Sequence, residues 1–249
     1  MEEIKRVGEL WPANPMMADR GIRIQLDKED GGEELLRMQV RAAVGAAADL
    51  LNEGKHPMLK LMLPLTIKPR EIDLAKEIMM DEAGKVIEKK CASSLQFEIG
   101  TMVETPNAAD NAAPFARRSR FFSWGTNDLT QMTLGYSRDD MGKRTPSYIR
   151  LGIFRRDVFE TIDPDLANKI RKANKIARKA NPKLKIGGCG EHFGDPISIK
   201  EHFAGMGFDT ISCAGIRVPG AWLSLAQYEI EREMASRYKP WRREFWRRK

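Results

Sequence analysis

The feature that most constrains this chain is a regular alternation of short apolar segments with longer segments of helical periodicity. Short apolar runs are typical of buried strands, and the longer segments repeat their apolar residues at helical spacing. The expected strands cover residues 22–26, 58–63, 97–103, 121–124, 184–188 and 210–213. The expected helices cover residues 33–52, 70–90, 107–118, 164–180, 196–206 and 219–234.

This alternation predicts βαβ units and therefore a parallel sheet, either doubly wound or closed into a barrel. A complete (β/α)₈ barrel has eight strands in about 250 residues. Only six strands are expected here, so a barrel built from this chain lacks two of them. In the expected helix 33–52, the apolar stripe consists of Leu36, Val40, Val44 and Ala47.

Composition indicates a folded chain and shows where its positive charge lies. Hydrophobic residues make up 42% and charged residues 31% of the 249 residues, which excludes a disordered polar chain and a membrane-spanning protein. The net charge is +7. Residues 232–249, defined here as the tail, contain eight basic and two acidic residues, so residues 1–231 carry only +1. We expect residues 1–231 to form the domain and the tail to be a separate basic, aromatic segment.

Cysteine usage and the first residues bear on the compartment. The three cysteines are scattered and form no C-x-x-C pair, which favours a reducing compartment over a disulfide framework. Residues 1–10 contain no apolar signal segment. We therefore expect a cytoplasmic protein, or an organellar one if a presequence has been removed, and no membrane partner.

Polar side chains follow three of the expected strands at their carboxyl ends. Glu104 follows the strand 97–103, Asn127 and Asp128 follow the next strand, and Cys189 follows a third. Active sites of parallel α/β proteins lie at this edge of the sheet, so these residues form the candidate active site. Glu104 and Asp128 offer the hard oxygen ligands that Mg²⁺ prefers.

Each of these residues also has a purely structural interpretation. Glu104 and Asp128 could cap the helices that follow them, since Asp is a common N-cap residue. Arg20 suits bidentate binding of phosphate or carboxylate, or it forms a surface salt bridge. Cys189 lies between two glycines and is either exposed to a ligand or a small buried apolar residue, as we expect for the other two cysteines.

The motifs together resemble the phosphoenolpyruvate/pyruvate-binding barrel domain of the pyruvate, phosphate dikinase family, among the enzymes that use phosphoenolpyruvate (PEP). The matching segments include NPMMADRGIRI (14–24), GTMVETP (100–106), FFSWGTNDLTQMTLGYSRDDMGK (121–143), LKIGGCGEH (184–192) and ISCAGIRVP (211–219). They keep the family order from about residue 10 to about residue 228.

The resemblance implies a TIM-type (β/α) barrel that is incomplete, with about six of the eight βα units. It implies Mg²⁺ as the cofactor, with Glu104 and Asp128 as its ligands. It implies catalytic roles for Asn127, which hydrogen-bonds the substrate, and for Cys189, which protonates the methylene carbon of the pyruvate enolate. The substrate-binding residues implied by the resemblance are Arg20, Thr126, Asn127 and Asp128.

Several parts of the family pattern are missing or altered. No segments matching the family's first two strands precede Trp11, and neither the phosphohistidine motif nor the nucleotide-binding domain is found. Phe193, the turn Ala214-Gly215-Ile216 and Trp222 depart from the family residues at positions expected near the mouth of the site. We therefore expect a protein partner or a second copy of the chain to complete the barrel.

Three functions stay open on the sequence. The first is the PEP- and pyruvate-binding part of a dikinase-like phosphotransferase, which other chains complement. The second is a non-catalytic structural or interaction subunit derived from a dikinase, associated with RNA through its tail. The third is an unrelated barrel enzyme that uses the same edge of the sheet for another 2-oxo acid.

The tail supports two interpretations. Met234, Tyr238, Trp241 and Phe245 recur at helical spacing, but Pro240 is expected to interrupt a continuous helix. Aromatic rings interleaved with arginines suit an RNA or another acidic partner, because the rings stack on bases and the cations meet phosphates. Alternatively, the aromatic residues pack back on the barrel and leave the arginines in solvent.

Overall fold

The expected parallel sheet is present in the computed structural model, which describes residues 20–139 and 141–247, with side chains through residue 236. Its strands are β1 (Leu59–Leu63), β2 (Phe97–Val103), β3 (Phe121–Gly125), β4 (Lys185–Cys189) and β5 (Thr210–Ile211). Every neighbouring pair is parallel, and the spatial order is β1-β2-β3-β4-β5. Five of the six expected strands are therefore confirmed, although β5 ends two residues early.

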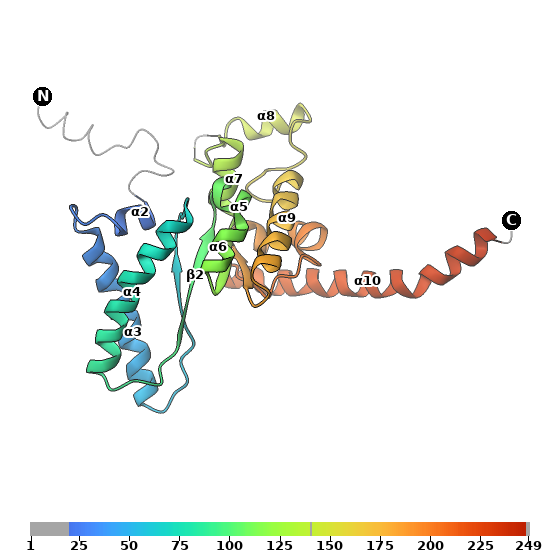
Figure 1. The fold of residues 1–249 in the computed structure, drawn as a ribbon. Coiled ribbons are helices and arrows are strands. Elements are labelled where there is room, and N and C mark those ends of the chain that lie inside the picture. Colours follow the sequence, from blue (N-terminus) through green and yellow to red (C-terminus); the bar gives the residue numbers. More distant parts are fainter. Residues whose placement is uncertain (1–19, 140, 248–249) are drawn as a thin grey trace, which may run out of the picture.

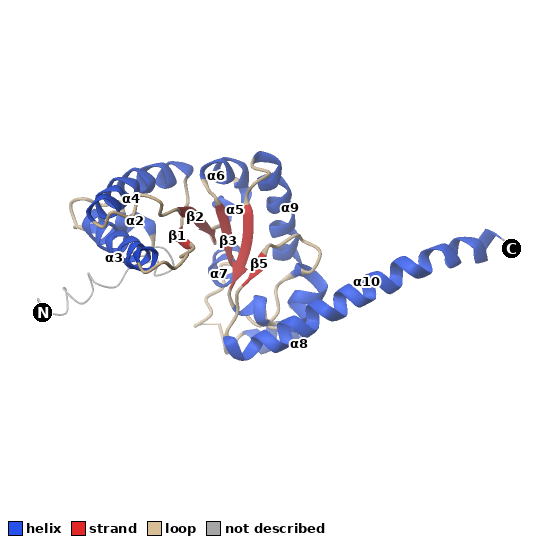
Figure 2. Cartoon of the chain, turned by 90° about the horizontal axis from the view of Figure 1, so that it is seen from below, coloured by secondary structure: helices blue, strands red, loops and turns tan. Residues whose placement is uncertain are grey.

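The helices pack beside this sheet (Figures 1 and 2). They are α2 (Ile22–Gln25), α3 (Gly32–Asn52), α4 (Pro69–Lys89), α5 (Pro106–Asp110), α6 (Ala112–Arg118), α7 (Thr126–Leu134), α8 (Thr145–Arg150), α9 (Pro164–Ala180) and α10 (Val218–Arg247), with shorter turns η1 (Glu191–Gly194), η2 (Ser198–Phe203) and η3 (Gly215–Arg217). The expected helix 107–118 is divided at Asn111 into α5 and α6, and η2 is a π-helix within the expected helix 196–206.

The strand order identifies the class of the sheet. Each connection leads to the next strand in the same direction, and right-handed crossovers then place the helices on one face, as in a TIM barrel. A doubly wound sheet reverses its direction and carries helices on both faces. Within the described residues β1 and β5 pair on one side only, so the barrel is open. The fold is therefore α/β with an incomplete TIM-type sheet, as expected.

The core lies between the sheet and the helices that cover its outer face. The predicted stripe of α3 is confirmed, because Leu36, Val40, Val44 and Ala47 are all buried. α3 packs against α4, and α6 packs against α9. The N-terminus of α9 is capped by Asp163, whose carboxylate accepts hydrogen bonds from the amides of Asp165 and Leu166. These contacts fix the positions of the strands whose ends carry the polar residues.

The expected strand at residues 22–26 is wrong, because this segment forms the one-turn helix α2. Its Ile-Arg-Ile-Gln-Leu sequence alternates like a strand, but a strand needs a neighbour to receive its backbone hydrogen bonds. Here the Ile22 amide donates to the Pro64 carbonyl at 3.1 Å, and the fully buried Ile22 side chain fixes the turn beyond β1. The segment packs on α3 instead of joining the sheet.

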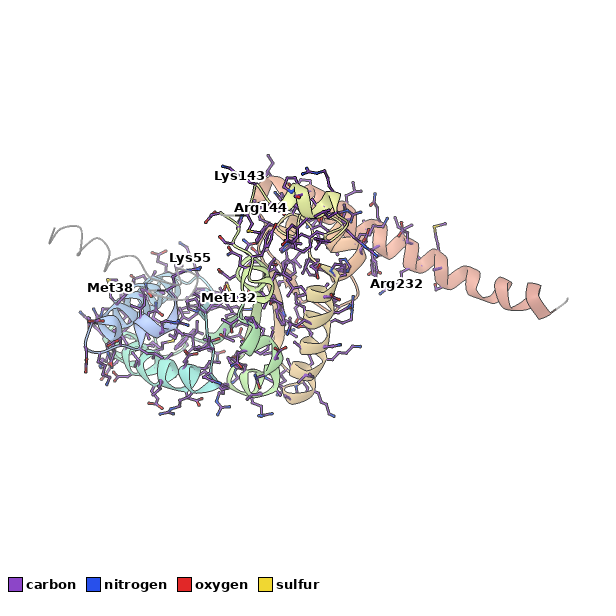
Figure 3. The ribbon with its side chains drawn as sticks, turned by 90° about the horizontal axis from the view of Figure 1, so that it is seen from above. Met38, Lys55, Met132, Lys143, Arg144 and Arg232 are labelled. Carbon is purple, nitrogen blue, oxygen red and sulfur yellow. The ribbon has the colours of Figure 1, made fainter. Side chains whose placement is uncertain are left out.

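The expected helix 219–234 is present but longer, because α10 continues to Arg247 and includes Pro240. A proline inside a helix removes one backbone hydrogen bond and favours a kink, but α10 continues through Pro240, so the interruption expected there does not occur. α10 leaves the body of the molecule and projects into solvent (Figures 1 and 2), with Arg232 on the projecting part (Figure 3). Among the described residues, no helix combines the length and apolar composition needed to cross a membrane.

Candidate active site

The strand register brings the polar ends of three strands to one level of the sheet. Val103 pairs with Trp124, and Gly125 pairs with Cys189, so Glu104 lies opposite Gly125 and one strand away from Cys189. Gly125 is required between them. A Cβ atom at this position would lie 2.5 Å from Oε2 of Glu104 and 2.8 Å from its Cβ.

Glu104 is buried and held in place by the backbone. Its side chain is 4% exposed, and its Oε1 accepts a hydrogen bond from the Leu65 amide at 2.7 Å. Burial, together with the negative charge of Asp128, raises the pKa of Glu104 to about 7, while the Leu65 amide and Arg20 act in the opposite direction. Glu104 therefore does not cap a helix in this structure, since its carboxyl group bonds a residue at the end of β1.

Asp128 lies in the first turn of α7 and faces Arg20. Gly125, not Asp128, is the N-cap residue of α7. The guanidinium group of Arg20 donates from Nη1 and Nη2 to the two Asp128 carboxylate oxygens, each at 3.2 Å. The sequence left phosphate binding and a salt bridge open for Arg20. In the structure its guanidinium is paired with Asp128 at the edge of the sheet where β2, β3 and β4 end, which we call the rim.

Thr126 and Asn127 hold the turn that follows β4. The buried Thr126 hydroxyl donates to the Cys189 carbonyl at 3.2 Å, and Oδ1 of Asn127 accepts from the Glu191 amide at 3.2 Å. Gly190 between them has φ of 112°, a conformation that favours glycine, and a Cβ there would lie 2.6 Å from the Thr126 hydroxyl. The structure therefore joins the ends of β3 and β4 through these two side chains.

Cys189 is half-buried at the end of β4. Its Sγ accepts a hydrogen bond from the Ser123 hydroxyl at 3.8 Å. Burial raises the pKa of the thiol, the charge of Glu104 adds to this, and the bond from Ser123 opposes it. The group is therefore a protonated thiol at neutral pH, which is the state that a proton donor needs.

The structure also adds rim residues that the sequence did not single out. Ser123 belongs to this group; in β3 it alternates with Phe122 and Trp124 and so points to the same face as the thiol. Arg217 of η3 pairs with Glu191, with Nη2 and Oε2 3.0 Å apart. The signal for Ser123 was strand alternation; Arg217 carried no signal beyond its place after β5.

Three residues expected near the mouth of the site differ in position. Phe193 is fully buried and stacks on Phe203 with ring centroids 4.2 Å apart, so it belongs to the core and not to the mouth. Gly188 leaves room for its ring. Ile216 and Trp222 are exposed, at 92% and 71%.

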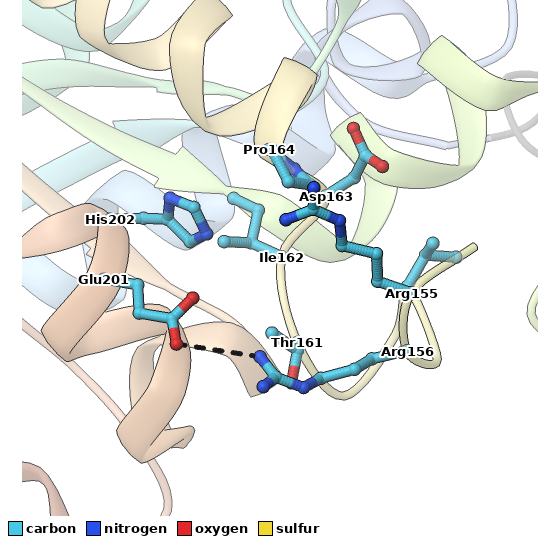
Figure 4. A pocket seen from close by; sticks show the side chains of 9 residues that line it. Arg155, Arg156, Thr161, Ile162, Asp163, Pro164, Glu201 and His202 are labelled. Atoms are coloured by element: carbon cyan, nitrogen blue, oxygen red, sulfur yellow. Dashed lines mark ion pairs between the residues drawn. The ribbon is translucent and has the colours of Figure 1, made fainter. Parts of the chain in front are cut away.

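A cavity of about 410 Å³ lies away from this rim, between the segment before α9 and η2 (Figure 4). Arg155, Arg156, Asp163, Glu201 and His202 are among its lining residues, and Arg156 pairs with Glu201 at 3.9 Å. None of the residues that line it belongs to the rim described above. A second hollow, of about 430 Å³, lies on the inner face of the sheet and reaches Ser123.

The donor atoms present at the rim can be compared with those that Mg²⁺ prefers. Within the described residues no cluster of three or more His, Cys, Asp or Glu side chains is arranged to hold a metal ion. The chain's contribution would be the two carboxylates of Glu104 and Asp128, and Mg²⁺ commonly takes one or two carboxylates with substrate and water oxygens. Part of the rise in the pKa of Glu104 comes from the negative charge of Asp128, so the two carboxyl groups lie close enough to interact. The residues therefore fit the ion.

Comparison with known proteins gives a consistent result for nearly the whole chain. The family described as "PEP-utilising enzyme, PEP-binding domain" matches residues 2–230. Pyruvate, phosphate dikinase 1, chloroplastic, of Arabidopsis thaliana is 41% identical over 230 residues, and the corresponding enzyme of Mesembryanthemum crystallinum is 42% identical over 227 residues. The matches cover 92% and 91% of this chain but only 23% of either relative.

A solved structure with a similar chain path is the citrate lyase beta subunit complexed with oxaloacetate and magnesium from M. tuberculosis. It is 18% identical, with a TM-score of 0.41, and the match covers 72% of this chain and 66% of that one.

Proposed function

Because the chain belongs to the family of PEP-binding domains of PEP-utilising enzymes, we propose that it is the PEP- and pyruvate-binding part of a dikinase-like phosphotransferase. The observation that carries the proposal is the strand register. It places Glu104, Gly125 and Cys189 at the same level of the sheet, with Asp128 and Arg20 beside them. Two carboxylates, a fork of cationic donors and a protonated thiol are thus gathered at one edge of the sheet.

Each group has a chemical task in this proposal. Arg20 supplies bidentate donors for the phosphate or carboxylate of the substrate, and Asn127 supplies its amide to the same ligand. Mg²⁺, bound by Glu104 and Asp128, would stabilise the negative charge of the enolate oxygen. Because Arg20 donates to both oxygens of Asp128, its guanidinium has to turn from this carboxylate toward the phosphate or carboxylate of the substrate when the substrate binds.

Cys189 is proposed as the acid that completes the reaction. Transfer of the phosphoryl group from PEP to an acceptor side chain that another chain supplies leaves the enolate of pyruvate. The Cys189 S–H bond then breaks as the proton forms a C–H bond at the methylene carbon, which leaves pyruvate and a thiolate. In the reverse direction the thiolate takes a methyl proton. Ser123 positions the sulfur through its hydrogen bond, and Thr126 holds the Cys189 carbonyl.

Ligand binding tests the first part of the proposal. Oxalate resembles the enolate of pyruvate, so isothermal titration with oxalate is expected to show binding with Mg²⁺ and at least about tenfold weaker binding with EDTA. Glu104→Gln should lose the Mg²⁺ dependence, while the exposed Glu53→Gln should keep it. No binding of oxalate or PEP, even after addition of a fragment that supplies the two absent strands, would overturn it.

Proton exchange tests the thiol separately. With Mg²⁺ in D₂O, the methyl group of pyruvate is expected to gain deuterium, which NMR detects as loss of the methyl proton signal. Cys189→Ser should slow this exchange by about 100-fold or more, within the range of general acid–base catalysis, and still bind oxalate. Cys91→Ser is the matched control. Equal exchange in the two variants would remove Cys189 from the mechanism.

A second function is favoured by the open sheet. Within the described residues β1 and β5 each leave one edge unpaired, and the known relatives are about four times longer than this chain. We therefore propose that a protein partner or a second copy of the chain completes the barrel. The second function is that of a non-catalytic interaction subunit, in the cytoplasm or an organelle. A thermal-shift screen of PEP, pyruvate and oxaloacetate separates these functions, since only a ligand that binds the folded state raises Tm. Stabilisation by oxaloacetate alone would favour the third function, an unrelated barrel enzyme that acts on another 2-oxo acid.

A further inference from the structure

The helix α9 concentrates positive charge on a domain that is nearly neutral as a whole. Residues 1–231 carry a net charge of +1, yet α9 contains six basic residues and one acidic residue. The basic residues are Lys169, Arg171, Lys172, Lys175, Arg178 and Lys179. The average charge of the domain therefore conceals a strongly basic element.

The exposed lysines of α9 share one face. Lys172, Lys175 and Lys179 follow one another at spacings of three and four residues, which places them on one side of a helix. All three are exposed, and Lys183 is exposed in the turn that follows. The opposite side of α9 is buried against the sheet, where Asn174 bonds the indole of Trp124. We call Lys172, Lys175, Lys179 and Lys183 the α9 lysine face.

These lysines lack the acidic partners that several other surface cations of the molecule have. Within the described residues none of the four forms an ion pair within 4.0 Å, whereas Lys169 and Arg178 on the same helix pair with Asp110 and Asp209. On α3 and α4 most of the basic side chains are paired as well, for example Arg37 with Glu33 at 2.8 Å. The charge of the α9 lysine face is therefore uncompensated, which favours a polyanionic ligand.

The tail extends from the same side of the molecule. Figures 1 and 2 both show α10 leaving the body on the side on which α9 lies. The described side chains of residues 231–236 are all exposed. The sequence of the tail adds a net charge of +6 and the aromatic residues Tyr238, Trp241, Phe245 and Trp246.

We propose that the α9 lysine face and the tail together bind single-stranded RNA, with the lysines on its phosphates and the tail aromatics on its bases. We favour nucleic acid over a protein partner for two reasons. Lysine is depleted in protein interfaces, and α9 exposes only one large apolar side chain, Ile176, at 47%. A lipid surface fits less well, because the helix presents no apolar face to insert. Unpaired bases are favoured because aromatic rings stack on them. This proposal is independent of the proposed catalytic function.

Fluorescence anisotropy with the full chain and a labelled poly(U) of about 20 nucleotides tests the proposal over a salt series. The variant with Lys172→Gln, Lys175→Gln, Lys179→Gln and Lys183→Gln is expected to bind at least about tenfold more weakly. The slope of log K against log salt should fall by about 2–3, since each phosphate contact on a single strand contributes about 0.7. Deletion of residues 232–249 should weaken binding further.

The matched control removes the same charge elsewhere. Lys89→Gln, Lys143→Gln, Arg144→Gln and Arg150→Gln change four exposed cations outside α9 that form no ion pair within the described residues, and this variant should bind RNA as the wild type does within about twofold. Because all eight substituted side chains are exposed, both variants should have the wild-type Tm. Equal RNA affinity of the two variants would overturn the proposal. So would tighter binding to polyglutamate or to phosphatidylserine vesicles than to poly(U).

Discussion

Among the rim residues, Glu104 is the one whose protonation affects the site most. Its pKa is raised from 4.5 to about 7 by burial, so the folded state holds a proton that the unfolded state releases. Below pH 4.5 both states are protonated and there is no cost. Between about pH 4.5 and 7 the free energy of unfolding falls, because ionisation of the carboxyl group is easier in the unfolded state than in the folded state. Above pH 7 this loss is complete, at about 3 kcal/mol.

Glu104→Gln removes this titration but keeps an oxygen for the Leu65 amide. We expect the variant to gain stability over the wild type as the pH rises, by up to about 3 kcal/mol at pH 8 and by little at pH 4.5. Urea unfolding in EDTA at both pH values measures the difference. A difference that stays constant with pH would contradict the burial of a protonated carboxyl group.

Gly125 is the residue whose lack of a side chain the rim requires most directly. Gly125→Ala places a Cβ 2.5 Å from Oε2 of Glu104, which must then shift. We expect a loss of about 1–3 kcal/mol of stability and weaker oxalate binding, measured by unfolding and titration. In the control Gly84→Ala, no atom lies within 4 Å of the new Cβ, and the substitution in α4 should stabilise by about 0.5–1 kcal/mol.

The positions of Glu104, Asp128 and Cys189 could be predicted because each follows a strand whose carboxyl end is fixed by the fold class. The partners of these residues could not. The ion pair of Arg20 with Asp128 joins positions 108 residues apart, and the register that sets Gly125 between Glu104 and Cys189 depends on how the strands align. Local patterns carry no information on either.

At the scale of elements, α9 is attached to β3 by a buried polar contact. The Nε1 group of the fully buried Trp124 donates to Oδ1 of Asn174 at 2.8 Å. Asn174→Ala leaves this donor without a partner, so we expect a loss of about 1–3 kcal/mol in urea unfolding. The neighbouring Lys175→Ala is exposed and should change stability by less than about 0.5 kcal/mol. Equal stability of the two variants would mean that water replaces the asparagine.

The elements that sequence periodicity identified correctly include the long amphipathic helices and the strands that they cover. α3, α4 and α9 are long and amphipathic, and strands β1 to β4 are flanked by helices. The segment 22–26 has a strand pattern, but no strand of the described residues pairs with it, so its contacts with Pro64 and α3 decide its conformation. Tertiary contacts therefore decide the conformation of this segment, and the sequence of five residues alone holds no information on those contacts.

At the scale of the whole molecule, the open sheet and the projecting helix pose different questions. Within residues 20–139 and 141–247, β1 and β5 each leave one row of backbone groups unpaired, which is suitable for pairing with another chain. The tail is attached through α10, whose first turns are packed, since Ala221 and Ser224 are buried. Beyond Ile230 the described side chains of α10 face solvent. The domain is therefore expected to be independent of the tail.

Deletion of residues 232–249 tests this division. Because residues 231–236 are all exposed and the pair of Lys200 with Glu231 is retained, we expect no loss of buried apolar area and a Tm within about 2 °C of the full chain. Oxalate binding should be unchanged, because the rim lies on strands β2 to β4 and on α7. Differential scanning calorimetry and titration measure the two effects. A Tm lower by about 5 °C or more would instead correspond to roughly 1–2 kcal/mol of packing by the tail aromatics on the domain.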